Sequence, residues 1–148
     1  MEKFWASLLV IPIFMWYSFN FALDRDFKIK QQLVQNTVYQ YTQIAAKKGM
    51  LYDSVYNEME TKLNRVGAFD ISVSAEKFTV GSDIPVVITN EDVINKNLRE
   101  EGFDIINIYV QSRNEHPLSR LYEITPYGTS TGQDCDIRFF GKASVYIQ

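Results

Sequence analysis

The sequence is poor in the residues that build covalent and metal-bound frameworks. Its 148 residues include one cysteine, Cys135, and one histidine, His116. A single cysteine excludes a disulfide within the chain, and a single histidine excludes the usual His/Cys frameworks for zinc. We therefore expect no cofactor, no metal site and no redox centre.

Recognisable catalytic signatures are also missing. Cys135 stands between Asp134 and Asp136, and flanking carboxylates disfavour the thiolate, which makes this cysteine a poor nucleophile. His116 precedes a proline in a polar stretch and has no serine or cysteine partner at a fixed spacing. No acidic segment fits a calcium loop, and no glycine-rich segment continues into the Gly-Lys-Ser/Thr of a phosphate-binding loop. We expect a protein that is not an enzyme and has no catalytic residues.

The charge balance excludes a further class of function. The formal net charge is −3 and the isoelectric point is about 5.2, without a cluster or stripe of basic residues. A nucleic-acid-binding surface needs such a basic cluster to approach the phosphates. We expect no nucleic-acid binding.

What the sequence does have is an uncharged run near its N-terminus, from Phe4 to Leu23. About 20 apolar residues in a helix cross the hydrocarbon core of a bilayer. The apolar core of a secretory signal peptide has about 7–15 residues and ends at a small-x-small cleavage site, which does not follow here before Asp24. We therefore expect residues 1–23 to be a single-pass transmembrane and assembly segment rather than a cleaved signal.

The apolar run continues into an amphipathic helical pattern. From Asp24 to Lys48 there is no glycine or proline. Apolar residues recur at helical spacing on one face, at Phe27, Val34, Val38, Tyr41 and Ala45. Basic residues in the last turn and Gly49 just after it are a helix stop signal with a left-handed cap. The two patterns together predict one helix of about 45 residues, or roughly 65–70 Å at 1.5 Å per residue.

A second, shorter helix is predicted after Gly49. Asp53 or Ser54 is the expected N-cap, and Gly67 follows the last turn. Apolar residues recur at steps of four and three, at Val55, Met59, Leu63 and Val66. The connection between the two helices is short, so we expect the second helix to fold back against the first.

Beyond Gly67 the apolar period changes to two, which predicts strands. The expected strands lie within residues 71–80, 84–89, 105–110, 121–125 and 136–147, with a turn at 81–83, a short helix within 90–101 and loops at 112–119 and 126–133. Pro85 marks its strand as an edge strand or as the strand's first residue. The expected fold is α+β, in which residues 49–148 form a small globular head with a mainly antiparallel sheet.

This order of elements resembles the architecture of type IV pilins and pseudopilins. At the residue level the chain is most similar to the TadE-like group and to small pilin-like proteins of Gram-positive conjugative elements. The matching segments are Gln31-Gln32-Leu33, Ala45-Ala46-Lys47-Lys48-Gly49, the second helix through Leu63 to Gly67, and Gly141-Lys142-Ala143-Ser144-Val145-Tyr146. The chain departs from the pilin pattern in having no glycine before Phe4 and no acidic residue between Glu2 and Asp24.

The resemblance implies a subunit of a pilus-like surface filament. Such a subunit is held first in the cell membrane and then enters a helical homopolymer, where its partners are copies of itself and the pilus or conjugation machinery. Burying the apolar helix among copies replaces lipid with protein. The expected assembly helix contains Phe4, Leu8, Ile11, Pro12, Phe14, Met15, Phe19, Phe27, Val34 and Tyr41.

The alternative is a membrane-anchored accessory component of a secretion or conjugation apparatus that does not polymerise. The flanking charges do not decide the orientation of either protein. Arg25, Lys28 and Lys30 follow the apolar run and only Lys3 precedes it, which slightly favours a cytoplasmic C-terminal part. The tail of three residues before Phe4 is nevertheless short enough to remain inside the cell.

Overall fold

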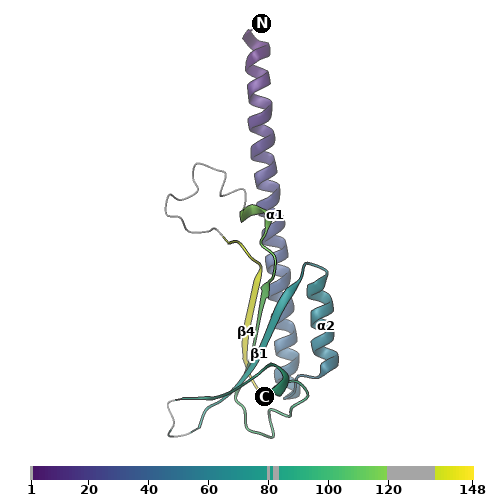
Figure 1. Ribbon diagram of the computed structural model, residues 1–148, viewed down its shortest axis with the longest axis vertical. Coiled ribbons are helices and arrows are strands. Elements are labelled where there is room, and N and C mark those ends of the chain that lie inside the picture. The colour runs from purple at the N-terminus through teal and green to yellow at the C-terminus, as the bar shows by residue number, and fades with distance from the viewer. Residues whose placement is uncertain (1, 80, 82–83, 120–135) are drawn as a thin grey trace.

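The computed structural model describes residues 2–79, 81, 84–119 and 136–148, with side chains from Val10 onward. This part of the chain has a long helix, a shorter helix and a four-stranded antiparallel sheet (Figure 1). The elements are α1 (Glu2–Lys48), α2 (Asp53–Asn64), β1 (Phe69–Lys77), β2 (Val86–Thr89), a 3-10 turn (Asn90–Asp92), β3 (Ile105–Ser112) and β4 (Phe140–Tyr146). The predicted α+β class is confirmed. The strand expected at 121–125 and the loop expected at 126–133 lie outside the described residues.

Helix α1 is a single element of 47 residues, and its two halves differ in surroundings. The C-terminal half packs along the sheet and α2, whereas the N-terminal half extends beyond the head (Figure 1). The helix ends as the sequence predicts, because Gly49 has a φ of 68°. The Met50 N–H donates to the Ala45 carbonyl at 3.2 Å and the Gly49 N–H to Ala46 at 3.3 Å, which is a Schellman ending.

Helix α2 runs antiparallel to the lower part of α1, as the short connection predicts. At one end of the pair the Lys48 ammonium lies 5.3 Å from the centre of the Tyr52 ring. At the other end the Lys62 ammonium lies 5.0 Å from the centre of the Tyr41 ring. The first contact lies at the connection between the helices, and the second joins the last turn of α2 to Tyr41 within α1. The two helices therefore form a helical hairpin.

The N-cap of α2 differs from the sequence prediction of Asp53 or Ser54. The cap residue is Tyr52, which makes no side-chain capping hydrogen bond. Asn95, from a distant loop, supplies the missing acceptor: its Oδ1 accepts the Asp53 N–H at 3.1 Å and its Nδ2 donates to Asp53 Oδ2 at 2.9 Å. A tertiary contact therefore replaces the local cap.

The sheet has the strand order β2-β1-β3-β4, and one of its faces is covered by the helices. Ile108 lies opposite Val73 on one side and opposite Ala143 on the other, and all three are buried against the helices. Alternate residues, such as Asn107 and Tyr109, lie on the other face. β2 begins directly after Pro85 and is an edge strand, as the sequence predicts.

Helix α1 packs closely against β4 at Gly141. A Cβ atom on Gly141 would lie 2.8 Å from Val38 Cγ2 and 3.2 Å from Val34 Cγ1. Real Cβ atoms do not pack at the shorter of these distances, so the absence of a side chain permits the close approach. Any larger residue at position 141 would therefore require the Val38 side chain to move.

Replacing Gly141 with alanine is expected to destabilise the head by about 1–3 kcal/mol, because the new methyl group overpacks the contact between α1 and β4. The matched control is Gly67→Ala, whose Cβ would meet only Phe69 at an ordinary 3.8 Å. Urea unfolding followed by circular dichroism measures the free energy of unfolding of both variants. Equal stability of Gly141→Ala and the parent chain would contradict the close packing described here.

Candidate assembly surface

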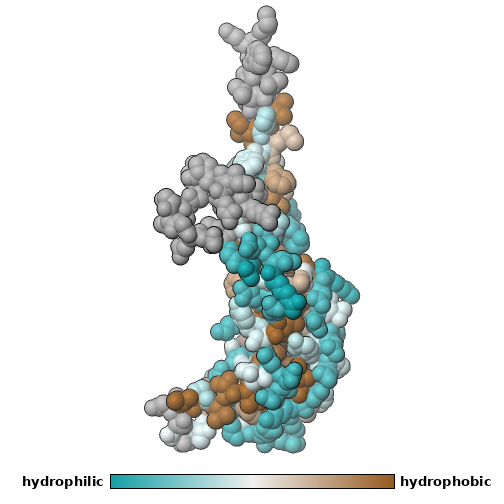
Figure 2. Space-filling model, viewed as in Figure 1, coloured by the Kyte–Doolittle hydropathy of each residue, from teal (hydrophilic) through white to brown (hydrophobic). Residues whose placement is uncertain are grey.

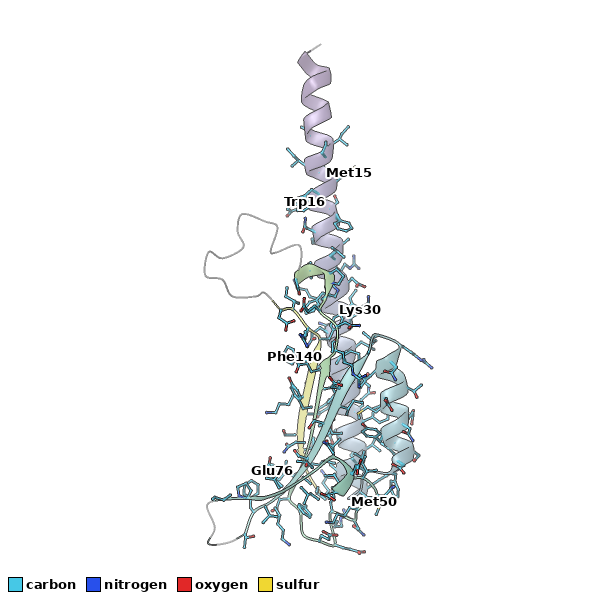
Figure 3. All side chains as sticks on the ribbon, in the orientation of Figure 1. Met15, Trp16, Lys30, Met50, Glu76 and Phe140 are labelled. Carbon is cyan, nitrogen blue, oxygen red and sulfur yellow. The ribbon has the colours of Figure 1, made fainter. Side chains whose placement is uncertain are left out.

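The protruding half of α1 exposes large apolar side chains on all sides. Phe14 is 69% exposed and Met15 66%, and Ile11 and Phe19 are exposed as well. Other exposed apolar side chains here are Val10, Ile13, Trp16, Tyr17 and Phe21. Figure 2 shows this hydrophobic column rising from a mostly hydrophilic head, and Figure 3 marks Met15 and Trp16 on it. Successive residues of a helix are turned by about 100° around its axis. The exposed apolar side chains therefore lie all around the column, which has no continuous polar face.

The structure describes only part of the predicted apolar segment. Phe4 and Leu8 lie outside the residues whose side chains are described, and Pro12 lies within the helix and is exposed. Over the described residues no helix is both long and apolar enough to cross a membrane.

Three residues expected on the assembly helix pack instead inside the head. Val34 is 0% exposed and Tyr41 is 2% exposed, both within the core formed with the sheet and α2. The Phe27 ring stacks on Phe139 with 5.1 Å between ring centres. The amphipathic face predicted from the sequence therefore buries the chain's own core. It does not form a surface for another copy.

An aromatic cluster anchors the root of the protruding half. His116 follows β3, is 7% exposed and lies edge-on to Phe27 and Phe139, with ring centres 5.1 and 5.3 Å away. Its Nδ1 accepts the Leu118 N–H at 3.3 Å. This geometry gives His116 a packing role that the sequence does not indicate, because its partners lie on α1 and just before β4.

The charge of His116 is controlled by its surroundings. Burial lowers the pKa of the imidazole, because the charged form loses its hydration. Asp26, whose Oδ2 lies 4.0 Å from His116 Nε2, opposes this shift, and Lys30 adds to it. Asp26 is itself paired with Lys30 at 2.7 Å, so the carboxylate is shared.

Two glutamines of α1 occupy the free edge of β4. The Gln31 amide donates to the Phe140 carbonyl at 2.7 Å and its Oε1 accepts the Phe140 N–H at 3.1 Å. Gln35 makes the same pair of bonds with Lys142, at 2.8 and 3.2 Å. The two glutamines are one helical turn apart and their targets are two strand residues apart. Each side chain thus replaces the backbone of a missing neighbouring strand, and Figure 3 marks Phe140 where α1 enters the head.

A belt of ion pairs separates the apolar half from the docked half. Asp24 pairs with Lys28 at 2.7 Å, and Asp26 pairs with Lys30 at 2.7 Å, both one helical turn apart. Exposed pairs of this kind contribute little to stability. They place paired opposite charges on α1 directly after the uncharged run that ends at Leu23.

The described residues hold no group of three or more His, Cys, Asp or Glu side chains that could bind a metal ion. Two shallow hollows of about 500 Å³ lie on the head. One is lined by Arg113, Asn114, Glu115 and Pro117, and the other, on the open face of the sheet, by Ser74, Glu76, Ile105, Asn107, Tyr109, Lys142 and Ser144.

No family model, curated protein or solved structure matches the chain significantly. Its candidate site is therefore defined by the geometry of α1 and the head.

The docked half of α1 carries an exposed apolar ridge that the sequence pattern does not predict. Ile29, Leu33 and Ile44 are exposed there, outside the buried face of α1. Their spacing of four and eleven residues is a helical signal, but polar residues such as Asn36 and Gln40 interrupt it. The ridge extends the exposed apolar surface of the protruding half downward along the head.

Replacing Gln35 with leucine is expected to lower the free energy of unfolding by about 1–3 kcal/mol, because two hydrogen bonds to Lys142 are lost, each worth about 0.5–1.5 kcal/mol. Gln32→Leu, which changes an exposed neighbour on α1, is the control and is expected to leave stability unchanged. Hydrogen exchange of the Lys142 amide should become faster in Gln35→Leu only. Unchanged exchange at Lys142 would contradict the edge contact.

Stability is expected to fall as the pH drops below about 6.5, the ordinary histidine value, because the unfolded chain then binds a proton that buried His116 resists. The folded-state pKa lies below the unfolded one. His116→Asn keeps an acceptor for Leu118 and should remove this part of the pH dependence.

A proton-detected NMR titration of the imidazole in the folded chain measures the pKa of His116 directly. A value at or above about 6.5 would contradict the burial described here.

Proposed function

We propose that this protein is the structural subunit of a type IV pilus-like surface filament. The observation that supports the proposal is the exposed, uncharged half of α1, which continues rigidly from a folded head. Copies pack through these helical halves, and the heads lie outside the bundle. The filament is thus a homopolymer of one chain.

Packing among copies keeps the apolar column out of water once it has left the membrane. Each large apolar side chain left in water instead would cost about 1.5–3 kcal/mol. The exposed residues include Ile11 and Ile13, which are turned about 200° apart around the helix. One helix can therefore contact several neighbours at once, which is what a bundle requires.

The proposed polymer is open rather than closed. Each column contacts successive neighbours through different sides of the helix, so contacts between copies are heterologous. Such contacts produce an open polymer when the rotation between copies does not close a ring. The rigid docking of α1 at Gly141 fixes the direction in which the column points.

The protein occupies different locations before and after assembly. The apolar half rests in the cell membrane as a single-pass segment until the filament machinery extracts it. The assembled chain lies at the cell surface. The proposed partners are other copies, the membrane before assembly, and the pilus or conjugation machinery.

Replacing Ile11 or Phe14 with aspartate is expected to abolish filaments, because a carboxylate would be buried without a partner in the bundle. The control Asn57→Asp adds the same charge on the exposed side of α2 and should leave filaments intact. Electron microscopy of sheared surface fractions, with antibody labelling of the chain, measures the outcome. Absence of labelled filaments in the parent strain, or their persistence in Ile11→Asp, would contradict the proposal.

A further inference from the structure

A second exposed apolar surface lies at the opposite end of the head. It is formed around the hairpin that joins β1 to β2, where Ile84 is 78% exposed and Phe78, Val86 and Val87 are each exposed by half or more. Figure 2 shows this patch as a hydrophobic projection at the end of the head away from the apolar column. The two apolar surfaces are therefore separate, and the column does not account for the hairpin patch.

The direction of the β1 backbone groups follows from one side-chain contact. The Val73 N–H donates to Asn90 Oδ1 at 3.2 Å, and Asn90 directly follows β2. Val73 therefore directs its backbone groups toward β2. Because these directions alternate along a strand, Ala75 and Lys77 do the same.

The outer edge of β2 follows from this direction. Ala75 lies opposite Ile88 and Lys77 opposite Val86, so Ile88 and Val86 bond to β1. Val87 and Thr89, at the alternate positions, direct their N–H and C=O groups away from the sheet. Among the described residues, none donates to or accepts from these groups of Val87.

The outward backbone groups of the two edge strands therefore differ in their hydrogen bonding. At β4 the outward groups of Phe140 and Lys142 are satisfied by glutamines of α1. At β2 the outward groups of Val87 have no partner among the residues that the structure describes, and the strand itself carries only Val, Ile and Thr. Edge strands that stay unpaired in solution usually carry charges, and β2 has none.

We propose that β2 pairs antiparallel with β2 of a second copy, centred on Val87. The Val87 N–H and C=O bond to the same groups of the second copy. In this register each Thr89 lies opposite Pro85 of the other copy, and the Thr89 N–H donates to the Pro85 carbonyl. The return bond to the Thr89 carbonyl is missing in each such pair, because proline has no N–H. In this arrangement the outward donors and acceptors of β2 in one copy lie opposite the acceptors and donors of β2 in the other. The outer edge of β2 is thus self-complementary.

Charge also favours a second copy in this orientation. β2 is neutral, so two copies do not repel along the strand. In an antiparallel pair the N-terminal end of β2 in one copy lies near the C-terminal end of β2 in the other. The N-terminal end lies beside Lys77, and the C-terminal end is followed by Glu91 and Asp92. Parallel pairing would place the acidic ends together. The contact joins heads and does not rest on the proposed filament function.

The experiment measures disulfide formation between full-length chains in detergent, in a Cys135→Ser background. Val87→Cys is expected to form a dimer at least about tenfold faster than Glu58→Cys, an exposed control on α2, because residues paired across antiparallel strands have Cα atoms about 5.5 Å apart. The same rate enhancement is expected when Ile11→Asp is added, since that change affects only the column. Equal rates at positions 87 and 58 would overturn the proposal.

A second variant tests the contact without a thiol. Val87→Lys places a charge on the exposed edge and is expected to abolish dimers in sedimentation, while the melting temperature of the head stays the same. Unchanged dimers in Val87→Lys would overturn the proposal. Loss of the Val87→Cys adduct in the Ile11→Asp chain would also overturn it, since the contact would then follow from filament packing. Filament loss with retained adducts leaves this pairing intact.

Discussion

The close contact between α1 and β4 is the constraint on which the rest of the structure depends. Gly141 lets Val34 and Val38 of the helix approach the strand to a distance at which a Cβ atom would clash. Gln31 and Gln35 then satisfy the outward backbone groups of the strand. Packing and hydrogen bonding act over the same two helical turns, so the helix is fixed in both position and rotation. A helix fixed in this way carries its direction beyond the head, because α1 is one continuous element of 47 residues.

That continuity links folding to the proposed function. The docked half of α1 is stabilised by the head, whereas the protruding half has no partner within the described chain for side chains such as Phe14 and Met15. The cluster of Phe27, His116 and Phe139 lies between them and ties the root of the protruding half to the segments around β3 and β4. An apolar surface held rigidly and left open is suited to contact with other copies. The second open surface, at β2, suggests that the heads add contacts of their own.

Much of the fold could be predicted from local patterns, and the failures have a common physical cause. The helical period, the stop at Gly49 and the edge position of β2 depend on neighbouring residues and were accessible from sequence. The cap of α2 by Asn95 and the edge contacts of Gln31 and Gln35 join residues far apart in the chain, which no local pattern shows. Gly141 is predicted from the sequence as a strand interruption, although in the fold it is a point of close packing between α1 and β4. Phe27, Val34 and Tyr41 lie on the expected helical face, but periodicity does not tell whether a face meets its own head or another copy.

The most direct test of the central claim is crosslinking between copies through the protruding half in cells. A Cys135→Ser chain with Ile11→Cys and Ile13→Cys carries two thiols turned about 200° apart around the helix. Oxidation of surface fractions is predicted to produce a ladder of multimers that contain only this chain, because each helix has neighbours on more than one side. A single adduct with a different protein, or monomer alone, would contradict the account.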